Sequence, residues 1–131
     1  MIALREILGN QDIEELSPEI QSNLFELLSR VNKVRTAYNK TLIVTSGFRS
    51  MKHHLEIYKA KGVTKVPLQS NHLYGRAVDI LDTKRELQAW CKANVPLLEN
   101  IGLWMEDFRY TPNWVHVQIV PPASGNRFFI P

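Results

Sequence analysis

The segment SNHLYGRAVD at residues 70–79 carries His72 and Asp79 seven residues apart. On a continuous helix, that spacing would separate the two side chains by about 10 Å along the axis. Ligands of one zinc ion must bring their donor atoms much closer, because each metal bond is only about 2.0–2.2 Å long. A shared metal therefore requires the chain to fold back between them, and Gly75 is placed to permit that turn.

A second histidine, His116, lies in the apolar run of residues 114–118. With His72 and Asp79 it supplies two imidazoles and one carboxylate, the ligand set typical of a catalytic zinc with one open position. Taken singly, His116 is explained as a structural histidine and His72 as an exposed loop residue. Asp79 is harder to explain alone, because a buried unpaired carboxylate costs several kcal/mol. Together the three residues predict a metal site.

Side-chain alternation along two predicted strands supports the same site. In a strand over 77–81, Val78 and Ile80 lie on the face opposite Asp79. In a strand over 114–120, the valines at positions 115 and 117 lie opposite His116 by the same rule. Each strand therefore has one aliphatic and one polar face. A sheet with its core on one side and a zinc cleft on the other would have this pattern.

The first half of the chain has strong helix signals. Ser17 and Pro18 are typical of a helix start, as N-cap and first residue. The apolar residues that follow recur at helical spacing and predict a helix running to about Tyr38; they are Ile20, Leu24, Leu27, Leu28, Val31 and Val34. Residues 1–16 are expected to be a short helical or irregular lead-in.

The remaining elements are predicted from shorter signals. We expect strands at 42–45, 77–81, 101–107 and 114–120. We expect helices at 51–61 and 84–94, with a break after the second helix marked by Pro96. The segment 62–70 is predicted to be a loop broken by Pro67, and the tail after residue 120 is predicted to be irregular and to pack on the body. Helices come first and strands mostly later. The predicted class is α+β, with helices packed on one face of a small antiparallel sheet and the zinc cleft on the other.

The composition limits the possible functions. A length of 131 residues suits one domain, so we expect residues 1–131 to form a single domain. The net charge of +3 comes without a lysine and arginine block, which gives a nucleic-acid partner little support. No stretch approaches the roughly 18 apolar residues of a membrane span. Without signal-peptide features, we expect synthesis in the cytoplasm.

The single cysteine and the two other histidines are given structural interpretations. Cys91 is the only cysteine, which excludes an internal disulfide and a cysteine-built zinc site. Its helical surroundings predict buried packing. His53 and His54, on the predicted helix over 51–61, are expected on the surface.

Three motifs carry a family resemblance. The segments SGFRS at 46–50, SNHLYGRAVD at 70–79 and WVHVQ at 114–118 resemble the zinc D-alanyl-D-alanine carboxypeptidase and L-alanyl-D-glutamate endopeptidase family, which shares its fold with the hedgehog signalling domain. The resemblance covers roughly residues 40–120. The first helix, the segment 99–103 and the tail segment 124–127 look most like the small single-domain members carried by bacteriophages.

The resemblance implies roles for particular residues. It implies one zinc ion held by His72, Asp79 and His116, with Arg49 polarising the scissile carbonyl. The position of Arg49 in a turn after a strand also suits a donor aimed into a cleft. Arg49, Ser70 and Trp114 are the predicted substrate-binding residues.

One position departs from the family pattern. Many relatives have the acid/base carboxylate three residues before the last histidine, where this chain has Asn113. An amide cannot take a proton from a zinc-bound water, so another carboxylate must act or the activity is lost. The alternation of residues 101, 103 and 105 places Glu106 on the cleft face and Asp107 on the core side or in the turn. We predict Glu106, although a one-residue shift in register would favour Asp107.

Three functional hypotheses follow. The first is a zinc peptidase that cleaves peptidoglycan stem peptides, acting at the cell wall after release or as a virion component. The second is a zinc-binding protein without catalytic activity, which acts as a structural or wall-binding component of a phage particle with other virion proteins as partners. The third is a metal-free module in which Asp79 pairs with Arg49 or Arg76.

Overall fold

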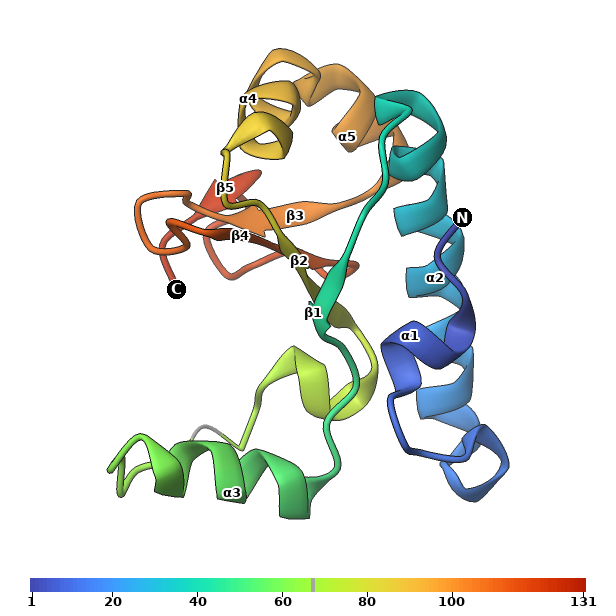
Figure 1. Cartoon of the computed structure of the whole chain (residues 1–131), viewed down its shortest axis with the longest axis vertical. Coiled ribbons are helices and arrows are strands. Elements are labelled where there is room, and N and C mark those ends of the chain that lie inside the picture. The colour runs from blue at the N-terminus through green and yellow to red at the C-terminus, as the bar shows by residue number, and fades with distance from the viewer. Residues whose placement is uncertain (67) are drawn as a thin grey trace.

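A five-stranded sheet is the centre of the computed structural model, which describes residues 1–66 and 68–131 (Figure 1). The strand order is β1-β2-β4-β3-β5. The strands are β1 (Val44–Ser46), β2 (Ala77–Leu81), β3 (Trp104–Glu106), β4 (Trp114–Gln118) and β5 (Phe128–Phe129). Pro67, on which the predicted break in the 62–70 loop rests, lies outside the described residues.

Helices surround this sheet unevenly. They are α1 (Leu4–Leu8), α2 (Pro18–Tyr38), α3 (Met51–Ala60), α4 (Glu86–Ala93) and α5 (Val95–Ile101), with short 3-10 helices η1 (Ile13–Glu15) and η2 (Asn71–Tyr74). Figure 1 shows α1 and α2 along one side of the sheet, α4 and α5 over one end, and α3 apart at the other end. Among the described residues, no helix is both long and apolar enough to cross a membrane.

Helix α2 forms as its sequence predicts. The Ser17 hydroxyl accepts a hydrogen bond from the Ile20 amide at 3.2 Å, so the cap satisfies a backbone donor that the first turn leaves free. The predicted apolar stripe faces the sheet, and Leu24 and Leu27 are completely buried. The helix ends at Asn39, whose left-handed backbone (φ 58°) stops the helical repeat.

The antiparallel pairing of β2 with β4 sets the two faces of the sheet. Asp79 pairs directly with His116, and Val78 pairs with Val117. Because side chains alternate along each strand, the first pair lies on one face and the second on the other. Val78 and Val117 are buried in the hydrophobic core with residues of α2, whereas Asp79 and His116 face the opposite side. The predicted division into a core face and a polar face is confirmed.

The region around Pro96 agrees with the prediction only in part. Helix α4 ends at Ala93, so the predicted break is present, but Pro96 then lies in the first turn of a new helix, α5, where a missing backbone N–H costs nothing. The helix continues to Ile101, so the predicted strand over 101–107 is reduced to β3. The apolar alternation of residues 101–105 was misleading there, because Ile101 is buried from the last turn of a helix.

The C-terminal tail also differs from the prediction. Residues 128–129 form β5, which pairs parallel with β3, so one edge of the otherwise antiparallel sheet is parallel. Met105 donates its amide to the Arg127 carbonyl at 2.9 Å, and Asp107 donates to the Phe129 carbonyl at 2.7 Å. The tail thereby covers the edge of β3 that would otherwise be open.

The two adjacent histidines of α3 have opposite environments. His53 is exposed, as predicted, whereas the prediction for His54 is wrong because its side chain is completely buried. Neighbouring residues on a helix point about 100° apart, so only one of the pair can face the body. His54 packs edge-on against Tyr58, four residues later, with ring centroids 4.9 Å apart.

Cys91 is buried within the core, as predicted. Burial, reinforced by the charge of Asp82, raises the pKa of the Cys91 thiol to about 12. The reactive species is the thiolate, so we expect the native protein to resist Ellman's reagent at pH 8 and to react fully once unfolded in guanidinium. Rapid labelling of the native protein would contradict this packing.

Candidate metal centre

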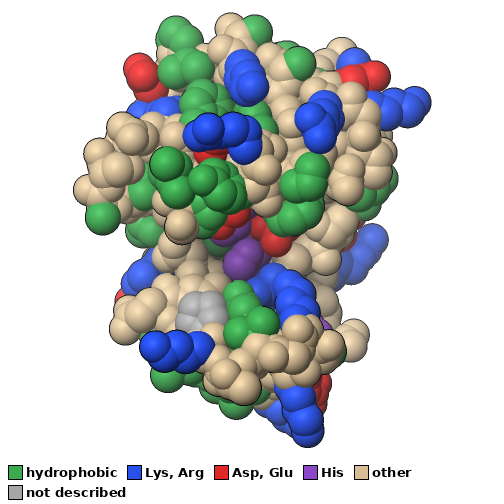
Figure 2. Space-filling model, turned by 90° about the vertical axis from the view of Figure 1, so that its left-hand side faces the viewer, with side chains coloured by type: hydrophobic (Ala, Val, Ile, Leu, Met, Phe, Trp, Pro, Cys, Tyr) green, Lys and Arg blue, Asp and Glu red, His purple; other side chains and the backbone are tan. Residues whose placement is uncertain are grey.

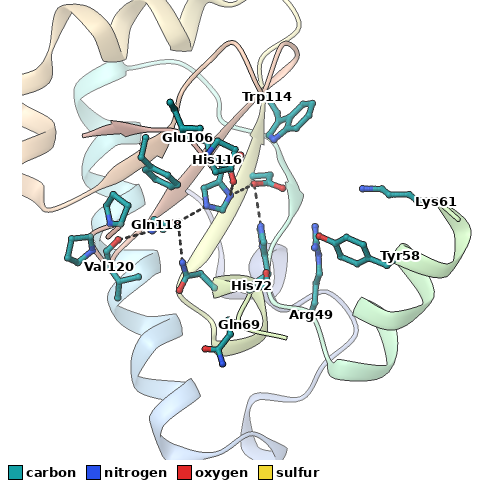
Figure 3. A pocket seen from close by; sticks show the side chains of 18 residues that line it. Arg49, Tyr58, Lys61, Gln69, His72, Glu106, Trp114, His116, Gln118 and Val120 are labelled. Carbon is teal, nitrogen blue, oxygen red and sulfur yellow. Dashed lines mark hydrogen bonds and ion pairs between the residues drawn. The ribbon is translucent and has the colours of Figure 1, made fainter. Parts of the chain in front are cut away.

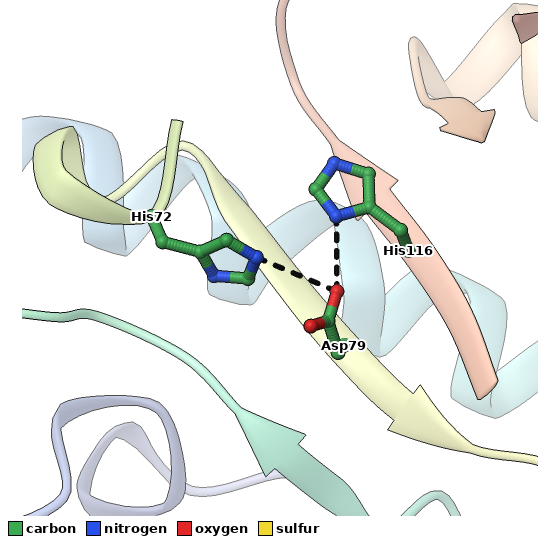
Figure 4. Close-up of side chains that lie close together, drawn as sticks. All are labelled: His72, Asp79 and His116. Atoms are coloured by element: carbon green, nitrogen blue, oxygen red, sulfur yellow. Dashed lines mark hydrogen bonds and ion pairs between the residues drawn. The ribbon is translucent and has the colours of Figure 1, made fainter. Parts of the chain in front are cut away.

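Three side chains from separate segments converge on the polar face of the sheet. Donor atoms of His72, Asp79 and His116 all lie within 4.8 Å of one another (Figure 4). The Asp79 Oδ1 atom is 2.9 Å from His116 Nδ1 and 3.4 Å from His72 Nε2. Ligand atoms of a tetrahedral zinc with bonds of 2.0–2.2 Å are about 3.4 Å apart. The spacing and the chemistry of this donor set fit one metal ion.

The chain reversal between His72 and Asp79 occurs at Gly75. Helix η2 carries His72 and ends at Gly75, whose φ of +70° glycine adopts without the steric cost that a Cβ atom brings. A Cβ atom there would also lie 2.7 Å from the side chain of Leu24 on α2. Strand β2 begins two residues later and runs back past His72. The turn that the sequence required is therefore present at the predicted residue.

A backbone carbonyl orients the His72 ring. Nδ1 of His72 lies 2.9 Å from the Gly47 carbonyl oxygen, which can only accept, so Nδ1 carries the proton and Nε2 is free to face Asp79. Gly47 packs so closely on α1 that a Cβ atom would overlap the Ile7 carbonyl. Only glycine brings this carbonyl to the ring. Sequence reasoning did not identify this role of Gly47.

A buried glutamine orients the His116 ring. Gln118 Oε1 lies 2.9 Å from His116 Nε2, and the Gln118 side-chain amide donates to the Val120 carbonyl at 2.9 Å. The second bond fixes which end of the glutamine faces the ring, so His116 Nε2 donates to the oxygen and Nδ1 faces Asp79. Asn71, next to His72, also donates to Gln118 Oε1, at 3.2 Å. Sequence reasoning missed Gln118, although its place two residues after His116 on the same strand face was a usable signal.

The electrostatics of the cluster favour an ionised carboxylate. Burial opposes ionisation of Asp79, but hydrogen bonds from His116 and His72 hold its pKa well below the usual value. Burial likewise acts to lower the pKa of His116, but the Asp79 hydrogen bond and the Glu106 charge raise it above the usual value. Both ring nitrogens of His116 face acceptors in this arrangement. A metal ion bound at Nδ1 would displace a proton from the ring.

The three candidate acid/base positions lie in different surroundings. Glu106 lines the same cavity as the cluster, and its Oε1 is 4.0 Å from His116 Nδ1. Asp107 instead binds Arg109 through two contacts of 3.0 Å and is not part of the cavity lining. Asn113 is exposed and also outside the lining. Of these three, only Glu106 adjoins the cluster.

The cluster lies in a cavity of about 710 Å³. Figure 2 shows histidine and acidic side chains at the bottom of a hollow across the middle of one face. Arg49, Ser70 and Trp114 all line this cavity, so the predicted substrate-binding residues are brought together around the cluster. Figure 3 shows Arg49 and Trp114 on either side of it. The tail adds a wall that the sequence did not reveal, because Phe129 packs edge-on against His116 with centroids 6.2 Å apart.

The ion pairs proposed for a metal-free module are not formed. Arg49 donates to the Ser46 hydroxyl, through Nε at 3.2 Å and Nη2 at 3.0 Å. Arg76 pairs with Glu19 at 3.2 Å. Within the residues that the structure describes, the side-chain partners of Asp79 are the two histidines.

Comparison with known proteins identifies the family. The Peptidase M15 family profile matches residues 5–118, which include all three residues of the cluster. The chain belongs to the M15 peptidase family. A search of the curated proteins gave no significant match for this M15 peptidase.

A solved structure agrees with the fold of this M15 peptidase. The L-Ala D-Glu endopeptidase ChiX of Serratia marcescens superposes with a TM-score of 0.51 at 24% sequence identity. The alignment covers 84% of this chain and 94% of that structure. At this identity the likeness establishes the shared α+β fold.

Proposed function

We propose that this M15 peptidase is a zinc-dependent enzyme that hydrolyses peptide bonds in the stem peptides of peptidoglycan. The observation that carries the proposal is the cluster of His72, Asp79 and His116 with the Glu106 carboxylate 4.0 Å from His116 Nδ1. Two imidazoles, one carboxylate and an adjacent free carboxylate are what a hydrolytic zinc site requires. The printed activity of ChiX, an L-Ala D-Glu endopeptidase, supports this substrate class.

Five side chains and one metal ion share the proposed chemistry. His72, Asp79 and His116 would hold a zinc ion, which when bound lowers the pKa of its water toward about 7 and polarises a carbonyl. Glu106 takes a proton from the attacking water and passes it to the leaving amine. Arg49 lies across the cavity and donates to the oxygen on which negative charge develops.

The cellular setting is part of the same proposal. The buried core takes residues from α1, α2, α4, α5 and the sheet, which supports residues 1–131 acting as a single domain. We place its action at the cell wall, after release from the cytoplasm or as part of a virion. The segments 99–103 and 124–127, which resemble those of phage members of the family, motivate the phage assignment.

Digestion of purified peptidoglycan tests this function. We expect new muropeptides by mass spectrometry from protein supplied with zinc, none after treatment with a chelator, and recovery when zinc is restored. The cleaved bond is read directly from the product masses. An unchanged muropeptide profile, with stoichiometric zinc bound to the protein, would contradict the proposed peptidase activity.

A second candidate function is a zinc-binding structural or wall-binding component of a phage particle without turnover. Asn113 favours it, because many relatives carry their acid/base carboxylate at that position. The exposed location of Asn113, outside the cavity lining, and the presence of Glu106 inside it favour the enzyme instead. Substitutions at these two positions distinguish the candidates.

Replacing Gln118 by Leu is expected to weaken zinc binding by about 10- to 100-fold, the usual effect of losing a hydrogen-bond partner of a metal-bound histidine. Without the Gln118 oxygen, the His116 ring is free to turn away from Asp79. Competition with a chromophoric chelator measures the affinity. Gln88→Leu is the matched control, since Gln88 is equally buried but binds the carbonyls of Thr111 and Trp114. An equal loss of affinity in both variants would contradict the specific role.

A further inference from the structure

The cavity has a cationic wall opposite its metal-binding wall. Arg49 follows β1, and Lys61 follows directly after α3; both line the cavity, with Tyr58 of α3 beside them (Figure 3). The Lys61 ammonium lies 5.5 Å from the centre of the Tyr58 ring, a contact that directs it along this wall. The acidic groups of the lining, Asp79 and Glu106, belong to β2 and β3 across the cavity.

Within the described residues, neither of these two cations has an internal counter-ion. In the described part of the chain, Arg49 contacts only the Ser46 hydroxyl with its guanidinium, and neither Arg49 nor Lys61 forms an ion pair. Among the described residues Arg30, Arg76 and Arg109 pair with carboxylates and Arg127 does not, so what distinguishes Arg49 and Lys61 is that two unpaired cations line one cavity. A half-buried guanidinium and an ammonium at the rim of one cavity favour an anionic ligand.

Stem peptides carry an anion at a defined place. In an L-Ala–D-Glu bond the glutamate continues through its γ-carboxyl, so its α-carboxylate is free. In a terminal D-Ala–D-Ala bond the last residue likewise has a free α-carboxylate. In both, the negative charge lies on the carbon that carries the leaving amine. The shared chemistry is a D-residue with a free α-carboxylate directly after the scissile bond.

We propose that Lys61 binds this free α-carboxylate and makes the enzyme select substrates in which it is not amidated. The inference rests on the proposed peptidase function and adds a specificity residue to it. Arg49 lies beside His72 in Figure 3 and keeps its role at the carbonyl, whereas Lys61, directly after α3, reaches in from the rim of the cavity. Helix α3 contributes no residue to the hydrophobic core. The residues of this wall can therefore be substituted without disturbing the fold.

Matched synthetic peptides test the proposal. One pair contains an L-Ala–D-Glu bond with the α-carboxylate free or amidated, and the other ends in D-Ala–D-Ala with a free or amidated terminus. We expect kcat/KM about tenfold higher for the free form of whichever pair is cleaved, as one hydrogen bond to a charged group provides. The pair that is cleaved identifies the source of the carboxylate.

Variants of two lysines, one on α3 and one just beyond it, test whether Lys61 causes the preference for the free carboxylate. Lys61→Met is expected to lose the preference through a higher KM for the free form, while cleavage of the amidated form is retained. Lys59→Met, an exposed neighbour outside the cavity lining, should keep the full preference. A preference that survives in Lys61→Met, or equal cleavage of both forms by the natural protein, would overturn the inference alone. Failure to cleave any peptide would overturn the proposed function and the inference with it.

Discussion

Replacing Glu106 by Gln is expected to lower kcat by a factor of about 10²–10⁴, the usual contribution of a general acid–base. Glutamine keeps the shape of the side chain but cannot take a proton from water. Zinc content should be unchanged, because Glu106 is not one of the three clustered donors. Steady-state cleavage of a defined stem peptide, with zinc measured on the same sample, tests both expectations.

Two neighbouring positions provide the controls. Asp107→Asn should retain activity, because this carboxylate binds Arg109 rather than lining the cavity. Asn113→Asp should change kcat little, because Asn113 is exposed outside the lining. Full turnover in Glu106→Gln would show that the acid/base assignment is wrong. Activity appearing only in Asn113→Asp would favour the structural component over the enzyme.

Replacing Asp79 by Asn is expected to abolish zinc-dependent stabilisation. The carboxylate lies between the two histidines and supplies the only negative charge among the three donors. Zinc at 100 times its dissociation constant stabilises the natural fold by about 2.7 kcal/mol, a gain that disappears when the affinity falls more than 100-fold. Thermal unfolding with and without added zinc measures this difference.

A buried aspartate outside the cluster makes the comparison specific. Asp82 accepts hydrogen bonds from the amides of Leu87 and Gln88 at 3.0 and 2.8 Å, and therefore caps α4 rather than facing the cavity. Asp82→Asn should lower the unfolding temperature while keeping the zinc-dependent increase. If Asp79→Asn also keeps that increase, the metal lies elsewhere.

Local rules predicted the parts of the structure that depend on local chemistry. The cap at Ser17 and the helical spacing after it defined α2, because both act within a few residues. Strand alternation assigned the faces of Asp79 and His116 because one face of each strand is buried in the core. The glycine-permitted turn at Gly75 completed the prediction of the cluster.

The features that the sequence did not reveal depend on tertiary contacts. Strand β5 has only two residues and exists because the edge of β3 is there to pair with it. Burial of His54 depends on which side of α3 faces the body, which adjacent histidines leave undecided. The contacts of Gly47 and Gln118 with the two histidine rings require the folded positions of η2 and β4. The short helix α5 was hidden by Pro96, which acts as a helix starter as readily as a breaker.

Locating the metal ion shows directly whether His72, Asp79 and His116 bind it. X-ray diffraction from zinc-loaded crystals, measured on both sides of the zinc absorption edge, locates the ion by its anomalous signal. We predict one strong peak about 2.0–2.2 Å from His72 Nε2, an Asp79 oxygen and His116 Nδ1, with the Glu106 carboxylate in hydrogen-bond reach of the fourth, open position. A peak away from these residues would show that the metal site lies elsewhere, and a fourth protein ligand would show that it has no open position for water.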